Sequence, residues 1–182
     1  FLSKIVGEWT ITGTERMKNR PIKLLVDALN SLGARIEYIE KEGYPPLRIF
    51  GSALQGGEIS LSGGVSSQYI SALLMVAPLM ENGLTIRLEG NVISRPYILL
   101  TLQLMEQFGV KASWAGQTIK VVPQEYKPIP FTVESDWSGA SYWYQMAALN
   151  KDAEVELIGL FKNSLQGDAA VAGIFTQLGV ST

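Results

Sequence analysis

The stretch LVDALNSLG, residues 25–33, sets the pattern on which the rest of the chain is built. Its apolar residues recur at i, i+3, i+4 and i+7 from Leu25, which defines one face of a helix. Gly33 follows as a residue able to take the left-handed conformation that ends many helices. The same spacing returns in TLQLMEQFG, residues 101–109, and in VAGIFTQLG, residues 171–179. The sequence therefore predicts three amphipathic helices that each end at a glycine.

Strand-like segments flank these helices. Partial alternation or β-branched residues predict strands before the helices at residues 9–12, 84–88 and 155–158. Similar segments predict strands after the helices at residues 34–39 and 110–114. Each helix is thus expected to lie between strands, as in an α/β fold.

A second kind of helix is predicted between these units. Residues 66–77 and 138–149 are apolar, begin with serine, and follow the short predicted strands at residues 58–62 and 131–133. The order then becomes β-α-β-β-α-β, repeating over roughly 70 to 75 residues. The sequence therefore predicts a mixed α/β (α+β) fold made of repeated units, of which about two and a half fit in the chain.

Composition excludes several kinds of chemistry. The 182 residues include no cysteine and no histidine, so this chain offers no disulfide, no cysteine or histidine metal ligand, and no Ser-His-Asp triad. Its net charge of -2 gives no electrostatic reason to expect a nucleic-acid partner. The longest apolar run, residues 70–80, is too short to span a bilayer, so no membrane partner is expected. Carboxylates, lysines, arginines, hydroxyls and backbone amides remain for any site.

The chain is predicted to divide near its proline-rich stretch, PQEYKPIP at residues 123–130. Its three prolines lack the N–H group that a central strand donates, so the stretch predicts a crossover between domains. The sequence stops at residues 180–182, where the earlier repeats continue into a strand. This predicts a truncated sequence.

The loop Ser62-Gly63-Gly64-Val65-Ser66-Ser67-Gln68 is the first candidate site. It joins a predicted strand to an apolar helix, and the amino-terminal end of a helix offers unpaired N–H groups and a partial positive charge. Two hydroxyls and an amide add further donors. The loop is therefore interpreted as a phosphate cradle, with an ordinary serine cap as the alternative.

A basic segment, Arg16-Met17-Lys18-Asn19-Arg20-Pro21, is the second candidate. Pro21 is suited to the first position of the helix that follows. Cations at the amino-terminal end of a helix oppose its dipole unless an anion offsets them, so the segment indicates an anion site. A solvated basic loop is the alternative.

The third candidate is Asn91-Val92-Ile93-Ser94-Arg95-Pro96-Tyr97, which again places Arg-Pro at a helix start. Ser94 can donate to a phosphate oxygen, and Tyr97 offers a ring with a polar tip. A helix cap with a packed tyrosine is the alternative. All three candidates follow strands and precede helices, which is the edge where α/β folds commonly bind ligands.

Together these segments resemble the 5-enolpyruvylshikimate-3-phosphate synthase family over close to the full length of the chain. The similarity runs, in the family's order, through TGTERMKNRPIKLLVDALNSLGA, EGYPPLRI, GGVSSQYISALLMVAPL, ISRPYI, LMEQFGV, ESDWSGASYW and KNSLQGD. RMKNRP, VSSQ and SRPY in succession are the most specific parts of the match.

The resemblance implies a two-domain, inside-out α/β barrel in which each domain contains three βαβαββ units. Residues 1–133 would then be two units of the domain that binds shikimate-3-phosphate, and residues 134–182 would be a partial unit of the second domain. The sequence would be an internal fragment of a cytoplasmic enzyme whose intact form is a monomer.

The resemblance also implies a reaction and its ligands. The family transfers the enolpyruvyl group of phosphoenolpyruvate to the 5-hydroxyl of shikimate-3-phosphate, by addition then elimination, without a metal, a cofactor or a covalent enzyme intermediate. Ser66, Ser67 and Ser94 would hold the phosphate of shikimate-3-phosphate. The remaining implied substrate-binding residues are Arg16 for phosphoenolpyruvate, Gln68 for both substrates, and Tyr97 near the shikimate ring.

Several of the family's functional segments have no counterpart in this sequence. They are the amino-terminal Lys-Ser-x-x-x-Arg, a Gly-rich loop, the general-base Asp, and later Lys, Arg and His residues. No catalytic residue is therefore predicted in this chain, and by itself it is expected to lack transferase activity and to bind shikimate-3-phosphate weakly at most.

Two alternatives accompany this interpretation. UDP-N-acetylglucosamine enolpyruvyl transferase shares the fold and the donor, although VSSQ and SRPY fit the shikimate enzyme better. A non-enzymatic repeat scaffold is the other alternative, and it predicts no stabilisation by a specific ligand.

Overall fold

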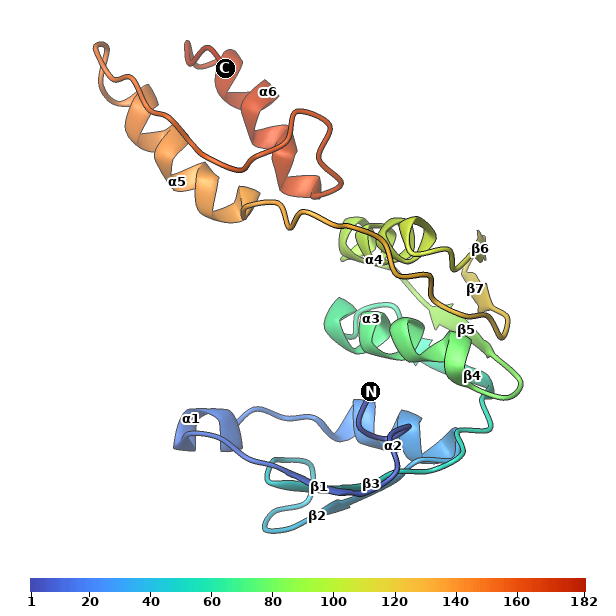
Figure 1. Ribbon diagram of the computed structural model, residues 1–182. Coiled ribbons are helices and arrows are strands. Elements are labelled where there is room, and N and C mark those ends of the chain that lie inside the picture. Colours follow the sequence, from blue (N-terminus) through green and yellow to red (C-terminus); the bar gives the residue numbers. More distant parts are fainter. The chain divides into compact units, whose positions relative to one another are not determined.

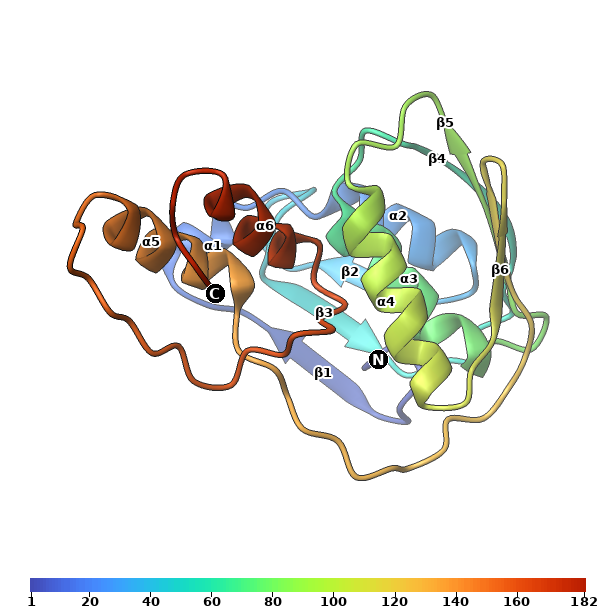
Figure 2. The same cartoon turned by 90° about the horizontal axis from the view of Figure 1, so that it is seen from above.

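A computed structural model describes all residues, 1–182, and they form two compact units, residues 1–127 and residues 128–182 (Figure 1). The first unit contains two sheets and the helices that cover them (Figure 2). No helix in the structure combines the length and apolar character that crossing a bilayer requires. The elements of the first unit are β1 (Glu8–Ile11), α1 (Glu15–Lys18), α2 (Lys23–Ser31), β2 (Arg35–Tyr38), β3 (Leu47–Phe50), β4 (Gly57–Ser62), α3 (Ser67–Val76), the short 3-10 helix η1 (Ala77–Leu79), β5 (Leu84–Glu89), α4 (Arg95–Gln107), β6 (Ala112–Ala115) and β7 (Thr118–Val121).

The first sheet is antiparallel throughout, with the order β1-β3-β2. Phe50 of β3 lies opposite Glu8 of β1 and Arg35 of β2, so β3 is the central strand. Buried Val26 of α2 packs with Ile36 and with inward residues of β3 to form a small core. The helix therefore covers one face of this sheet.

The second sheet has the order β4-β5-β7-β6. β4 and β5 are parallel neighbours, whereas β5 pairs with β7, and β7 with β6, in antiparallel fashion. Along the chain this gives β4-α3-β5-α4-β6-β7, one βαβαββ unit. The parallel pair requires a crossover, which α3 supplies.

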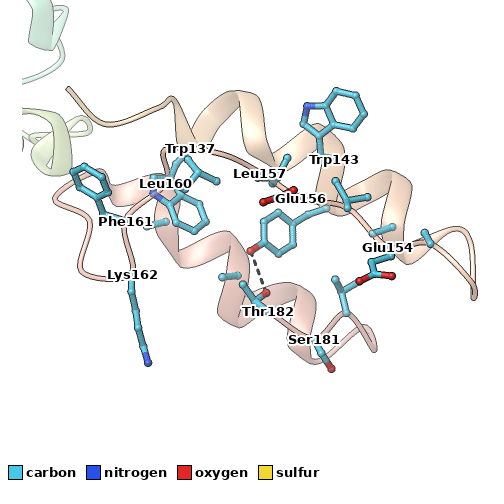
Figure 3. A pocket seen from close by; sticks show the side chains of 17 residues that line it. Trp137, Trp143, Glu154, Glu156, Leu157, Leu160, Phe161, Lys162, Ser181 and Thr182 are labelled. Atoms are coloured by element: carbon cyan, nitrogen blue, oxygen red, sulfur yellow. Dashed lines mark hydrogen bonds between the residues drawn. The ribbon is translucent and has the colours of Figure 1, made fainter. Parts of the chain in front are cut away.

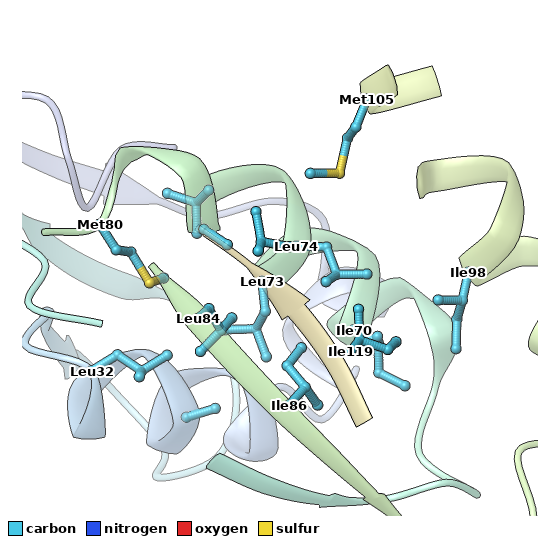
Figure 4. Close-up of a cluster of buried hydrophobic side chains, with 14 of the residues drawn as sticks. Leu32, Ile70, Leu73, Leu74, Met80, Leu84, Ile86, Ile98, Met105 and Ile119 are labelled. Carbon is cyan, nitrogen blue, oxygen red and sulfur yellow. The ribbon is translucent and has the colours of Figure 1, made fainter. Parts of the chain in front are cut away.

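The main core lies between this second sheet and its helices. Ile70, Leu73 and Leu74 of α3 and Ile98 of α4 are fully buried, and Leu32 at the end of α2 joins them (Figure 4). The inward residues of β5 alternate with exposed ones, as expected for a sheet with one face on the core. Burial of these side chains fixes α3 and α4 on the sheet and so fixes where both helices begin.

The three predicted glycine-terminated helices end in the same way. Gly33, Gly109 and Gly179 have φ values of 98°, 84° and 86°, the left-handed region that glycine enters without a steric penalty. The N–H of the residue after each glycine bonds the carbonyl five residues earlier, at 2.9, 2.9 and 3.1 Å. This is the 6→1 bond of the Schellman motif, so the sequence prediction of these helix ends is confirmed.

The second unit contains helices and loops without a sheet. Trp137, Ala140 and Tyr144 form its buried centre, against which Phe175 and its neighbours pack. Asp136 caps the first helix by accepting a hydrogen bond from the Ser138 N–H at 2.9 Å. The elements of this unit are α5 (Trp137–Ala148), the 3-10 helix η2 (Gly167–Ala170) and α6 (Val171–Thr176).

The structure corrects the predicted strands in two ways. Residues 131–133 and 155–158 are not strands, because no neighbouring strand forms a ladder with them. β3 and β7 were not predicted from the sequence, yet each lies inside a sheet. The predicted α/β fold class is confirmed, but the order of elements within the repeat is βαβαββ in the second sheet rather than β-α-β-β-α-β.

Candidate functional site

Two of the predicted site loops leave the second sheet at the same edge. Ser62 of β4 and Glu89 of β5 are paired in parallel register, so the chain leaves both strands side by side. The Gly63 N–H then donates to the Glu89 carbonyl at 2.7 Å. A β-carbon at Gly63 would lie only 2.8 Å from the carbonyl oxygen of Asn91. The loops that lead to α3 and α4 are therefore in direct contact.

The first loop delivers three predicted site residues to the start of α3. Ser66 is the N-cap residue, and its Oγ accepts a hydrogen bond from the Gln68 N–H at 3.3 Å. The cap leaves the hydroxyl proton of Ser66 available to donate outward. Ser67 is half-buried and Gln68 exposed in the first turn. The ordinary capping role and a phosphate-binding role are thus compatible in the same residue.

The second loop places Ser94 and Tyr97 at the start of α4. Ser94 occupies the N-cap position, but its side chain makes no cap hydrogen bond, so its hydroxyl is not committed to the helix. The Arg95 guanidinium lies 4.2 Å from the centre of the Trp114 ring. This cation–π contact holds the Arg95 side chain against the ring. Tyr97 is 49% exposed in the first turn.

The basic segment is placed differently from its prediction. Pro21 does not open a helix, because α2 begins at Lys23 with Ile22 as its N-cap. Arg16 and Lys18 instead lie in the last turn of α1, where cations interact favourably with the helix dipole. The predicted conflict with a helix dipole is therefore wrong, and it no longer supports an anion site.

The cations of this segment are nevertheless not equivalent. Lys18 lies 3.1 Å from Glu40, whose hydrogen bond raises the pKa of the Lys18 ammonium above its usual value. Arg16 and Arg20 are exposed and form no ion pair in the structure. Arg16 thus remains available to an exogenous anion.

A side-chain hydrogen bond links the basic segment to the start of α3. The hydroxyl of Tyr69, which follows Gln68, donates to the carbonyl oxygen of Pro21. Figure 1 shows α1 on the side of the first unit at which α3 and α4 begin. The basic segment that carries Arg16 is therefore joined through Pro21 to the first turn of α3, and the loop that carries Ser66 contacts the loop that leads to Ser94. Sequence reasoning did not single out Tyr69, because only its contact distinguishes it from an ordinary half-buried tyrosine.

A carboxylate in the second unit was also missed. Glu134 accepts hydrogen bonds from the Trp137 indole, the Ser164 hydroxyl and the Phe161 N–H at 2.7 to 2.8 Å, and a longer one from Gln166 at 3.2 Å. Burial alone would raise the pKa of Glu134, but these donors together outweigh it and hold the pKa below its usual value. All of its partners lie within this unit, which indicates a structural role.

The second unit also contains a cavity of about 790 Å³. Figure 3 shows Trp137, Leu157 and Leu160 on its wall, with the carboxylates of Glu154 and Glu156 and the Lys162 ammonium as its charged groups. None of the six predicted site residues lines it. Its apolar and net acidic lining is unsuited to a phosphate dianion. No group of three or more acidic side chains in the structure is placed to hold a metal ion.

The fold is an α/β arrangement that contains a βαβαββ unit, and two serine-bearing loops are in contact at the edge where β4 and β5 give way to α3 and α4. The model of the EPSP synthase (3-phosphoshikimate 1-carboxyvinyltransferase) family matches residues 1–182. The chain therefore belongs to the EPSP synthase family.

Individual relatives agree with this assignment. A 3-phosphoshikimate 1-carboxyvinyltransferase of Bacteroides fragilis is 61% identical over 183 residues, which cover 100% of this chain and 45% of that protein. The Vibrio cholerae protein of the same name is 47% identical over 176 residues, which cover 95% of this chain and 41% of that protein. The chain thus spans less than half the length of these curated relatives.

A solved structure supports the fold. The EPSP synthase from Acinetobacter baumannii superimposes with a TM-score of 0.75 at 24% identity, covering 98% of this chain and 39% of that chain. At this identity the likeness concerns the fold alone.

Proposed function

We propose that this chain supplies part of the substrate site of an EPSP synthase, which transfers the enolpyruvyl group of phosphoenolpyruvate to the 5-hydroxyl of shikimate-3-phosphate. Ser66, Ser67 and Ser94 hold the acceptor's phosphate. The observation that carries the proposal is the contact between the two loops, made by the Gly63 N–H and the Glu89 carbonyl at 2.7 Å. It places two serine-bearing helix starts side by side.

The chemistry of the gathered groups suits an anionic acceptor. A phosphate dianion gains charge-assisted hydrogen bonds from hydroxyl and backbone N–H donors at the start of the ten-residue helix α3. Arg16 offers a planar fork to the phosphate or carboxylate of phosphoenolpyruvate. Gln68 contacts both substrates, and Tyr97 lies near the shikimate ring. Residues 134–182 are proposed to belong to the second domain of the enzyme, which acts as a cytoplasmic monomer.

The first test is kinetic and uses the complete gene product that carries this chain. Ser94→Ala is expected to raise the KM for shikimate-3-phosphate about 10- to 100-fold, because a hydrogen bond to a charged group is lost. Ser113→Ala is the matched control, since Ser113 is exposed on β6. An unchanged KM in Ser94→Ala, or no phosphate release by the wild type, would refute the proposal.

The second test uses the 182-residue chain alone. The proposal predicts no turnover, because the chain has no counterpart of the family's general-base Asp. A ligand that saturates its site at 100 times its dissociation constant stabilises by about 2.7 kcal/mol. Thermal unfolding with shikimate-3-phosphate, and with shikimate as the control, decides whether any of the site is formed. Turnover of the isolated chain at an ordinary enzymatic rate would show that it does contain the catalytic residues, contrary to the proposal.

The two alternative functions lose support. The family match concerns EPSP synthase over the whole chain, not UDP-N-acetylglucosamine enolpyruvyl transferase. A direct comparison of the two acceptors in the same phosphate-release assay tests this. A repeat scaffold has no need of the uncommitted Ser94 hydroxyl or of the unpaired Arg16 guanidinium.

A further inference from the structure

Residues 14–22 contain α1 and the basic segment and are held together by internal hydrogen bonds. We call them the arginine segment. The Lys18 N–H donates to the Thr14 carbonyl at 3.1 Å, and the Asn19 side chain donates to the Glu15 carbonyl at 2.8 Å. These bonds lie within the segment. Arg16 therefore moves with the segment as a whole, and its position depends on what holds the segment.

Two kinds of attachment hold the arginine segment. On one side it is tied to the loop between β2 and β3, through Lys18 and Glu40 at 3.1 Å and through the Ile22 N–H and the Gly43 carbonyl at 2.8 Å. On the other side the Tyr69 hydroxyl donates to the Pro21 carbonyl. The first attachments join it to its own sheet, and Tyr69 joins it to α3.

The side chain of Tyr69 can hold the arginine segment in a fixed place relative to α3. It follows Gln68 in the first turn of α3, and the backbone of this helix is fixed by fully buried Ile70 and Leu73. Its acceptor belongs to a proline, whose ring restricts the backbone next to the carbonyl. A rigid ring thus spans from the phosphate-binding helix start to the arginine segment.

The opposite side of α3 carries a second link. The Thr101 hydroxyl donates its one proton to the Tyr97 carbonyl at 3.1 Å, so in its 2.7 Å contact with Ser71 the serine hydroxyl is the donor. Ser71 thereby connects α3 to the first turns of α4. Tyr69 thus bonds the arginine segment on one side of α3, and Ser71 bonds α4 on the opposite side.

We propose that Tyr69 is a positioning residue that sets Arg16 at the distance from Ser66 and Gln68 at which one site can hold both anionic substrates. This inference rests on the proposed function. It assigns Ser71 the corresponding role for Ser94 on α4. Neither residue touches substrate, and each acts through the segment it holds.

The test compares Tyr69→Phe and Ser71→Ala in the complete gene product. Tyr69→Phe is expected to raise the KM for phosphoenolpyruvate about 3- to 10-fold, the effect of one hydrogen bond, with the KM for shikimate-3-phosphate unchanged. Ser71→Ala is expected to give the reverse pattern. Tyr142→Phe is the control for a lost tyrosine hydroxyl, because Tyr142 is 67% exposed in α5. A purely structural role would lower both affinities together in either variant.

Hydrogen exchange supplies a readout that does not depend on activity. Tyr69→Phe is expected to speed exchange of the amides of residues 14–22, whereas Ser71→Ala leaves them unchanged. Unchanged exchange in Tyr69→Phe, or an equal rise of both KM values, would overturn the positioning role while leaving the proposed function intact. Wild-type protein without phosphate release would instead overturn the function, with the exchange result still deciding whether the link exists.

Discussion

The substitution Gly63→Ala is a direct test of the contact between the loops that follow β4 and β5. The added β-carbon would lie 2.8 Å from the Asn91 carbonyl oxygen and 3.1 Å from a methyl carbon of Val92. Ordinary contact begins at 3.4 Å, so the loops must separate by about 0.6 Å against backbone that cannot rotate away. Overpacking of this kind costs about 1–3 kcal/mol, and the bond from the Gly63 N–H to Glu89 lengthens with it.

Gly64→Ala is the matched control for this change. Its β-carbon would lie 3.7 Å from its nearest neighbour, the Ser62 Oγ, and neither glycine has a positive φ. Urea unfolding of the chain is expected to show a loss of about 1–3 kcal/mol for Gly63→Ala and a change within about 0.5 kcal/mol for Gly64→Ala. The complete gene product with Gly63→Ala should also show a raised KM for shikimate-3-phosphate. Equal stabilities of the two variants would refute the close approach of the loops.

Three further predictions follow from other contacts. Glu134→Gln is expected to destabilise the chain by about 1–3 kcal/mol near neutral pH. Because the folded pKa of Glu134 lies below its usual 4.5, its contribution is present above that pH and is lost as pH falls through the folded value, so urea unfolding of wild type and variant should converge in acid. Leu73→Ala, which empties a fully buried position, should cost about 2–5 kcal/mol by the same method, whereas Leu24→Ala at a 55% exposed position should cost less than about 0.5 kcal/mol. Arg16→Lys keeps the charge but loses the planar fork, so steady-state kinetics should show a higher KM for phosphoenolpyruvate and an unchanged KM for shikimate-3-phosphate.

Helices and their ends were predictable from the sequence because their signals are local. An apolar face and a following glycine decide a helix of two or three turns, and all three glycines take the expected conformation. Strands were harder to predict, because a strand forms only when a neighbouring strand pairs with it. LRIF, residues 47–50, has four residues and becomes a central strand only because β1 and β2 flank it. Residues 155–158 have strand-like composition but no such neighbour in the structure.

The candidate site could be proposed from the sequence as three segments, whereas the contacts between these segments could not. Strand-to-helix loops with hydroxyls and an arginine were visible in the sequence, and the parallel register that joins two of them follows from the α/β pattern. The conflict with a helix dipole that was predicted for the basic segment is absent, because α1 intervenes and places Arg16 in its last turn. The link through Tyr69 depends on one side-chain contact across 48 positions of sequence, which periodicity does not encode.

A crystal structure of the complete gene product with shikimate-3-phosphate and phosphoenolpyruvate tests the shared anion site most directly. We expect the hydroxyl oxygens of Ser66, Ser67 and Ser94 within about 3 Å of one phosphate group, and the Arg16 guanidinium on phosphoenolpyruvate beside it. Phosphate held by only one of the two loops, with Arg16 directed away from both substrates, would contradict this expectation.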